Sequence, residues 1–135
     1  MRRVTLDSNI YLSALNFRGI PLLLLDMGAR GNIQIAISDA ILQEVLRVQR
    51  EKFKAPPESL ERAKLLIEGC THWVVPTQTL KVVPDDADDN RIVECAVAAG
   101  SEAIVTGDKD LLRMGSYQGI YMMTAAAFLR QCRGI

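Results

Sequence analysis

Four acidic residues lie at the ends or borders of the strands and helices that the sequence predicts: Asp7, Glu44, Asp89 and Asp108. Asp7 and Asp108 each follow a short β-type run. Asp89 stands at the start of an apolar helix pattern, and Glu44 lies just outside the apolar stripe of another helix. Carboxylate oxygens without Cys or His partners suit Mg²⁺ or Mn²⁺ and disfavour zinc. Because gathered carboxylates repel one another unless a cation neutralises them, these residues predict a divalent-metal site.

The chemistry that such a site favours is phosphodiester hydrolysis. A divalent cation can orient and activate a water molecule and stabilise the charge that develops on a phosphate under attack. His72 is the only histidine in the chain, so a nucleophile activated by histidine is excluded, and water is the expected attacking group. A phosphatase of the aspartyl-phosphate type normally has a second Asp two residues after its nucleophile, and Asn9 occupies that place after Asp7.

Two of the four acids, Asp89 and Asp108, lie in the stretch 85–112, which is the most informative part of the chain. It opens with several carboxylates, continues as an apolar helix over residues 90–99 and turns at Gly100. A strand over residues 103–106 then leads to Asp108 and Asp110. In open α/β sheets, ligands bind beyond the carboxyl ends of the parallel strands, so this stretch predicts a site at that edge.

Strands and helices alternate along the rest of the sequence, which favours a parallel sheet covered by helices on both faces. Ser8 is a candidate N-cap for the first helix, Gly31 a candidate terminator for the second, and Thr124 a candidate cap for the last. The other expected elements are strands over 3–6, 32–37, 73–75 and 120–123, helices over 22–29, 39–53, 58–69 and 125–132, a β-like edge run over 80–83 and a turn over 115–119.

Length and composition set the class of protein. The 135 residues predict one domain, 1–135, and the formal net charge of zero gives no global attraction for a polyanion. No apolar run reaches eighteen residues and the N-terminus lacks a secretion signal, so we expect a cytoplasmic protein without membrane contact. The three cysteines are widely spaced, which argues against a disulfide framework and a zinc site.

Three segments together carry a resemblance to a known family: TLDSNIYLSAL, SDAILQEVLRV and DDADDNRIVECAVAAGSEAIVTGDKDLL. Their order and their acids resemble the successive motifs of PIN-domain ribonucleases, most closely the VapC-like toxins of bacterial toxin–antitoxin pairs. This resemblance implies a three-layer α/β/α sandwich with a central, mainly parallel twisted sheet. It also implies a hydrolase, a metal-dependent endoribonuclease that uses Mg²⁺ or Mn²⁺ to cut RNA.

The resemblance assigns one acid of each motif to catalysis and metal binding, namely Asp7, Glu44, Asp89 and Asp108. Asn9, Thr106, Asp110 and Asp86 are expected to support them. The third acid is the least determined, because Asp85, Asp86, Asp88 and Asp89 compete and one of them should cap the helix. We favour Asp89 because Ile92, Val93 and Ala96 follow it on the same helical face, with Asp86 as the alternative.

Contacts to RNA and to proteins are predicted less directly. Phosphate contacts require cations, and the candidates near the acids are Arg18, Arg47, Arg91 and Lys109, with Arg50 and Arg113 beside them. Tyr11, Phe17 and Tyr117 are the candidates for base stacking. The family resemblance implies a cognate antitoxin protein and a homodimer. A catalytically silent RNA- or protein-binding module on the same fold is the alternative, although such a module gains nothing from repelling carboxylates.

Overall fold

The computed structural model describes residues 2–84 and 86–133. Within this part the chain forms six strands and seven helices. The strands are β1 (Arg2–Leu6), β2 (Ile33–Ile37), β3 (Thr71–Trp73), β4 (Ala103–Val105), β5 (Ser116–Tyr117) and β6 (Ile120–Met123). The helices are α1 (Ser8–Phe17), α2 (Gly19–Ala29), α3 (Asp39–Glu51), α4 (Pro57–Cys70), α5 (Ala87–Ala99), α6 (Lys109–Met114) and α7 (Ala125–Cys132).

The strands form one sheet in the order β3-β2-β1-β4-β6-β5. All neighbours are parallel except β5 and β6, which form an antiparallel pair. In register, Val4 of β1 lies opposite Ile35 of β2 and Ala103 of β4. The chain reverses its direction of travel across the sheet between β3 and β4, so β1 and β4 are neighbours at the topological switch point. Ligands of doubly wound folds bind at that point.

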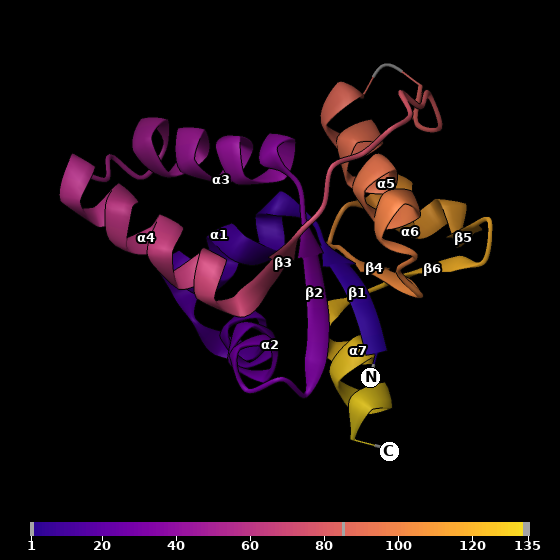
Figure 1. The fold of residues 1–135 in the computed structure, drawn as a ribbon, viewed down its shortest axis with the longest axis horizontal. Helices are drawn as coiled ribbons and strands as arrows, with labels where there is room; N and C mark the ends of the chain where they lie inside the picture. Colours follow the sequence, from indigo (N-terminus) through magenta and orange to yellow (C-terminus); the bar gives the residue numbers. More distant parts are fainter. Residues whose placement is uncertain (1, 85, 134–135) are drawn as a thin grey trace.

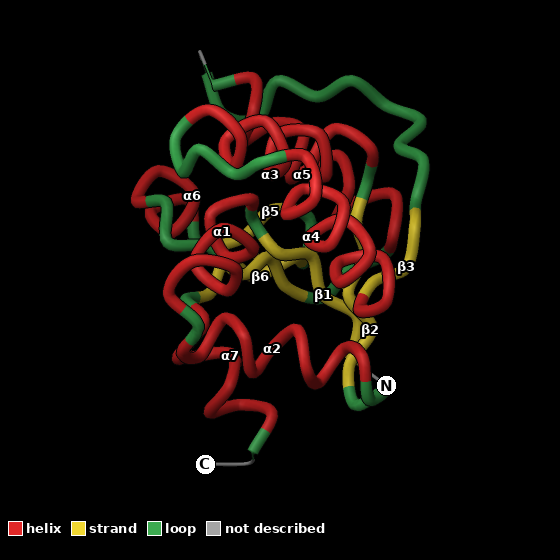
Figure 2. Tube along the Cα trace, turned by 90° about the vertical axis from the view of Figure 1, so that its left-hand side faces the viewer, coloured by secondary structure: helices red, strands yellow, loops and turns green. Residues whose placement is uncertain are grey.

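Helices cover both faces of the sheet, as Figure 1 shows. Helices α1 to α4 lie on one side of the strands, and α5 with the short α6 lies on the other. Helix α7 returns to the first side and packs against α2, where Figure 2 shows the two helices side by side. The expected three-layer α/β/α sandwich is therefore confirmed.

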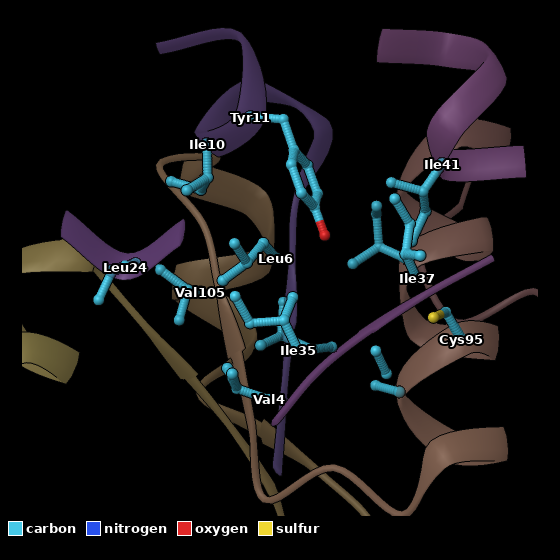
Figure 3. Packing of buried hydrophobic residues seen from close by; sticks show 14 of the residues in the cluster. Val4, Leu6, Ile10, Tyr11, Leu24, Ile35, Ile37, Ile41, Cys95 and Val105 are labelled. Carbon is cyan, nitrogen blue, oxygen red and sulfur yellow. The ribbon is translucent and has the colours of Figure 1, made fainter. Parts of the chain in front are cut away.

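Apolar side chains of the inner strands and of the helices form the core. Val4, Leu6, Ile35 and Ile104 are completely buried. Figure 3 shows Tyr11 reaching from α1 into this cluster, with its hydroxyl directed inward. Because parallel strands are buried on both faces, they read as nearly continuous apolar runs in the sequence.

Two helix ends behave as their sequences predict. Gly31, with a φ of +79°, follows α2, and the amides of Gly31 and Asn32 donate to the carbonyls of Gly28 and Met27. Glycine is favoured there because a Cβ is strained in the left-handed conformation. The Thr124 hydroxyl accepts the amide hydrogen of Ala127 and caps α7.

Several expectations for single elements were wrong. The first helix has its N-cap at Asp7, and Ser8 is its first helical residue. Strand β3 ends at Trp73, two residues before the expected end. Residues 80–83 form no strand, because side chains of α5 bind their backbone. Helix α6 and the short β5 were not expected, since the turn signals around residues 115–119 obscured both.

Among the described residues, no single helix has the length and apolar character needed to cross a membrane. The apolar pair α1 and α2 reaches that length only together, and the two helices bend by 105° at their junction.

Candidate metal centre

The ends of β1 and β4 place two of the predicted acids side by side. The Asp7 amide donates to the carbonyl of Val105 at 2.9 Å, which joins the two strand ends. Thr106, directly after β4, donates its hydroxyl hydrogen to Oδ2 of Asp7 at 2.7 Å. The Thr106 Oγ1 also accepts the amide hydrogen of Asp108 at 2.9 Å. Thr106 is fully buried, so one hydroxyl positions both acidic segments.

Asp86, Asp89 and Asp108 form the tightest carboxylate cluster. One oxygen of each lies within 4.8 Å of the others. Asp86 is the N-cap of α5, and its Oδ1 accepts the amide hydrogen of Asp89 at 3.0 Å. Asp108 caps α6 in the same way, accepting the amide hydrogens of Asp110 and Leu111. The structure thus brings together both candidates for the third acid, whereas Asp85 lies outside the described residues.

Glu44, on α3, lies near Asp7 and Asp88 and is not part of the cluster of Asp86, Asp89 and Asp108. Its Oε2 accepts the hydroxyl hydrogen of buried Ser8 at 2.6 Å, which holds it over the start of α1. The pKa of Glu44 is raised, mainly by burial, with smaller contributions from Asp88 and Asp7 and an opposing one from Ser8. Asp88 therefore lies close to Glu44. Local sequence patterns do not reveal this pairing or the role of Ser8, because both depend on how α1, α3 and α5 meet.

The pKa values report how strongly the acids are crowded. The pKa of Asp89 is raised to about 8, first by burial and then by Asp108, Asp86 and Asp7. Burial also raises the pKa of Asp7, against the opposing effect of the Thr106 hydroxyl. In the described part of the chain, no salt bridge reaches any of these acids.

A segment between β3 and α5 is held beside the cluster by two α5 side chains. Oδ1 of Asn90 accepts the amide hydrogens of Val82 and Val83, and its Nδ2 donates to the carbonyl of Val83. Glu94 accepts the amide hydrogen of Leu80 at 2.7 Å. The segment runs across the top of the molecule in Figure 2. These contacts fix the approach to Asp86, and the sequence pattern did not reveal them.

The predicted supporting residues lie in different surroundings. Thr106 is central, as described above. Asn9 is exposed on the first turn of α1. Asp110 is exposed on α6, and its carboxylate pairs with Arg113 at 3.2 Å, apart from the cluster of Asp86, Asp89 and Asp108.

The predicted RNA-binding side chains are also divided. Arg47 pairs with Glu51 at 3.0 Å, and Arg91 pairs with Glu94 at 2.6 Å. Arg18 and Lys109 are exposed, the latter directly after Asp108. The expectation that Tyr11 stacks on a base is wrong, because its ring is completely buried in the core.

The residues present fit a divalent cation. The donor set consists of carboxylate oxygens, which Mg²⁺ and Mn²⁺ prefer. Oδ2 of Asp89 is buried and accepts no hydrogen bond from the described residues, although buried polar atoms are normally paired. A cation between Asp86, Asp89 and Asp108 would satisfy this oxygen and offset the repulsion among the three carboxylates.

Comparison with known proteins agrees with this geometry. The sequence model of the PIN domain matches residues 3–110. The chain belongs to the PIN domain family. The match covers every acid of the site and ends before β5, β6 and α7. A search of curated protein sequences found no match.

Among solved structures, this PIN domain protein is similar to a chain in the crystal structure of VapBC2 from Rickettsia felis bound to a DNA fragment from their promoter. The two chains share 18% sequence identity, with a TM-score of 0.64. The alignment covers 90% of this chain and 98% of the other. At this identity the comparison establishes a shared fold.

Proposed function

We propose that this PIN domain protein is a Mg²⁺- or Mn²⁺-dependent endoribonuclease. The observation that carries the proposal is the convergence of Asp86, Asp89 and Asp108, with oxygens within 4.8 Å of one another and one buried oxygen left without a partner. A scaffold that only binds RNA or protein has no use for this arrangement, because the crowded carboxylates destabilise it.

The bound cation would supply a polarised water and neutralise charge on the phosphate. Asp89, Asp108 and Asp86 would hold it. Thr106 fixes Asp7 through its Oδ2. Ser8 fixes Glu44 in the same way. The pKa of Asp89, raised to about 8 by burial and by Asp108, Asp86 and Asp7, favours a protonated carboxyl near neutral pH, and a bound cation would displace that proton.

We also propose that the protein is the toxin of a toxin–antitoxin pair. The solved relative comes from a complex named VapBC2 bound to promoter DNA, and the similar fold spans nearly the whole of both chains. By this proposal a cognate antitoxin binds the protein and restrains its nuclease activity. A homodimer and a cytoplasmic location belong to the same proposal.

The test is cleavage of a labelled single-stranded RNA by the purified protein in Mn²⁺, beside a chelator control and an Asp7→Asn variant. We expect cleavage only by the wild type in the presence of metal. Folding of the variant is checked by circular dichroism, because a misfolded variant would also be inactive. Cleavage that persists in the folded variant or in chelator would contradict the proposal, and the absence of cleavage with all RNAs would favour a binding module.

A further inference from the structure

A hollow of about 400 Å³ lies where β2 and β3 end. Its walls are residues 73–79, the start of α3 at Ser38–Ala40, and Arg91 and Glu94 on α5. Figure 1 shows the segment after β3 rising between α3 and α5. The volume lies within the range of about 300–1,000 Å³ that is typical of sites for small ligands.

The hollow and the acids share one edge of the sheet. Asp7 and Asp108 follow β1 and β4, whereas Ser38 follows β2 and the segment from Trp73 follows β3. In the order β3-β2-β1-β4 these strands are neighbours, and neighbouring strands lie about 4.8 Å apart. The hollow at Ser38 is therefore one strand spacing from Asp7 and two from Asp108, and Trp73 is two and three spacings from them, roughly 10–14 Å.

Trp73 gives the hollow an aromatic surface. It is the only tryptophan in the chain, and it is 51% exposed although large apolar side chains are normally buried. Exposed aromatic rings in nucleic-acid-binding proteins stack on unpaired bases, because every base has a π-face. The sequence pattern predicts only a position in a strand for Trp73.

Polar groups surround the ring. Nε and Nη2 of Arg91 donate to the two carboxylate oxygens of Glu94 at 2.7 and 2.6 Å, which fixes the plane of the guanidinium. Glu94 is itself buried and is held by the amide of Leu80. Within residues 2–84 and 86–133, no hydrogen bond uses Nη1 of Arg91 or the amides of Thr77 and Gln78. Several hydrogen-bond donors are therefore available on residues that line the same hollow as Trp73.

The charges of the hollow favour a base over a phosphate group. The charge of Arg91 is offset by Glu94, and the exposed Asp39 adds a negative charge at the rim. A phosphate would meet net repulsion there, whereas a neutral ring with polar edges would meet a stacking surface and hydrogen-bonding groups.

We infer that this hollow binds one unpaired nucleobase of the RNA by stacking on Trp73, while a phosphodiester of the same strand is held at the acids. This rests on the proposed function in that RNA is the ligand. The inference makes Trp73 and Arg91 substrate-binding residues and restricts the substrate to single-stranded or unstacked RNA, because a base inside a duplex is not available for stacking.

Tryptophan fluorescence provides a test that is independent of cleavage. Single-stranded RNA is titrated into Asp7→Asn protein, which leaves the RNA intact, and Trp73 emission is recorded beside anisotropy of a label on the RNA. We expect saturable quenching with the same dissociation constant by both signals. Duplex RNA of the same sequence should quench much less. Trp73→Ala in the same background should bind about tenfold more weakly by anisotropy, and Trp73→Phe should retain most of the affinity.

Tyr121→Ala is the matched control, because Tyr121 is also an exposed aromatic residue, 62% exposed, on β6. Its removal should leave binding unchanged. RNA binding without quenching, or equal affinity of Trp73→Ala and wild type, overturns the inference even if the protein cleaves RNA. Quenching by an added peptide but not by RNA also overturns it, and shows instead that the free edge of β3 binds a peptide strand. Quenching by RNA without any cleavage in the wild type would refute the nuclease and leave the base site standing.

Discussion

Thr106 donates its hydroxyl hydrogen to Oδ2 of Asp7 at 2.7 Å, although 99 positions separate the two residues in the sequence. The same hydroxyl oxygen accepts the amide hydrogen of Asp108. One buried side chain thus fixes the first acid of the site and the segment that carries the last. The geometry of the proposed metal centre depends on this contact.

Thr106→Val removes the hydroxyl but keeps the shape of the side chain. We expect RNA cleavage and Mn²⁺ affinity to fall about 10–100-fold, since groups that orient metal ligands typically contribute that much. The free energy of unfolding should fall by about 1–3 kcal/mol because Asp7 loses a buried donor. Thr106→Ser, which keeps the hydroxyl, should stay near wild type in both assays. Wild-type cleavage by Thr106→Val would show that the contact is dispensable.

Asp108→Asn and Asp110→Asn form a matched pair on one short segment. Asparagine caps a helix as well as aspartate does, so α6 should persist in Asp108→Asn. We expect this variant to lose cleavage by at least a hundredfold, because a carboxylate of the cluster is gone. Asp110→Asn should cut within about twofold of wild type, since its carboxylate faces Arg113. Initial rates on one RNA measure both, and equal losses would refute this division.

The pKa of Asp89 predicts how stability depends on pH without metal. Between the ordinary pKa of 3.8 and about 8, native Asp89 holds a proton that the unfolded chain has released. The contribution of Asp89 to the free energy of unfolding should therefore be complete below pH 4 and should be lost as the pH rises toward 8. Asp89→Asn should flatten this slope and be more stable than wild type at pH 8. Urea unfolding in chelator at several pH values measures the free energy of unfolding of both proteins. A wild-type free energy that rises with pH relative to that of Asp89→Asn would contradict the prediction.

Asn90 is expected to stabilise the fold, with no direct part in the chemistry of the site. Asn90→Ala removes three hydrogen bonds to the segment beside Asp86, and we expect it to cost about 2–3 kcal/mol in urea unfolding. Gln43→Ala, on exposed α3 surface, should cost less than about 0.5 kcal/mol and serves as the control. Equal stability of the two variants would mean that the segment is held by other contacts.

The sequence predicted the layers, most helices and strands, and the segments that carry the acids, because apolar periodicity and cap residues are local signals. Gly31 and Thr124 are examples in which a residue type determines the end of a helix. Motif order also pointed to Thr106, whose role depends on a strand neighbour far along the chain.

The remaining features depend on tertiary contacts that local patterns do not encode. Residues 80–83 have the composition of a strand, but Asn90 and Glu94 bind their backbone and hold them as a loop. Ser8 has the composition of an N-cap, yet its hydroxyl binds Glu44 on another helix. The choice between Asp86 and Asp89 was posed as an alternative, whereas the fold places both beside Asp108.

Isothermal titration of Mn²⁺ into wild-type and Asp89→Asn protein measures directly whether the carboxylates bind a cation. We expect a saturable site in the wild type, with proton release near pH 7, and at least tenfold weaker binding with no such release in the variant. Absence of binding in the wild type, or an unchanged isotherm in folded Asp89→Asn, would contradict the assignment of these carboxylates as a metal centre.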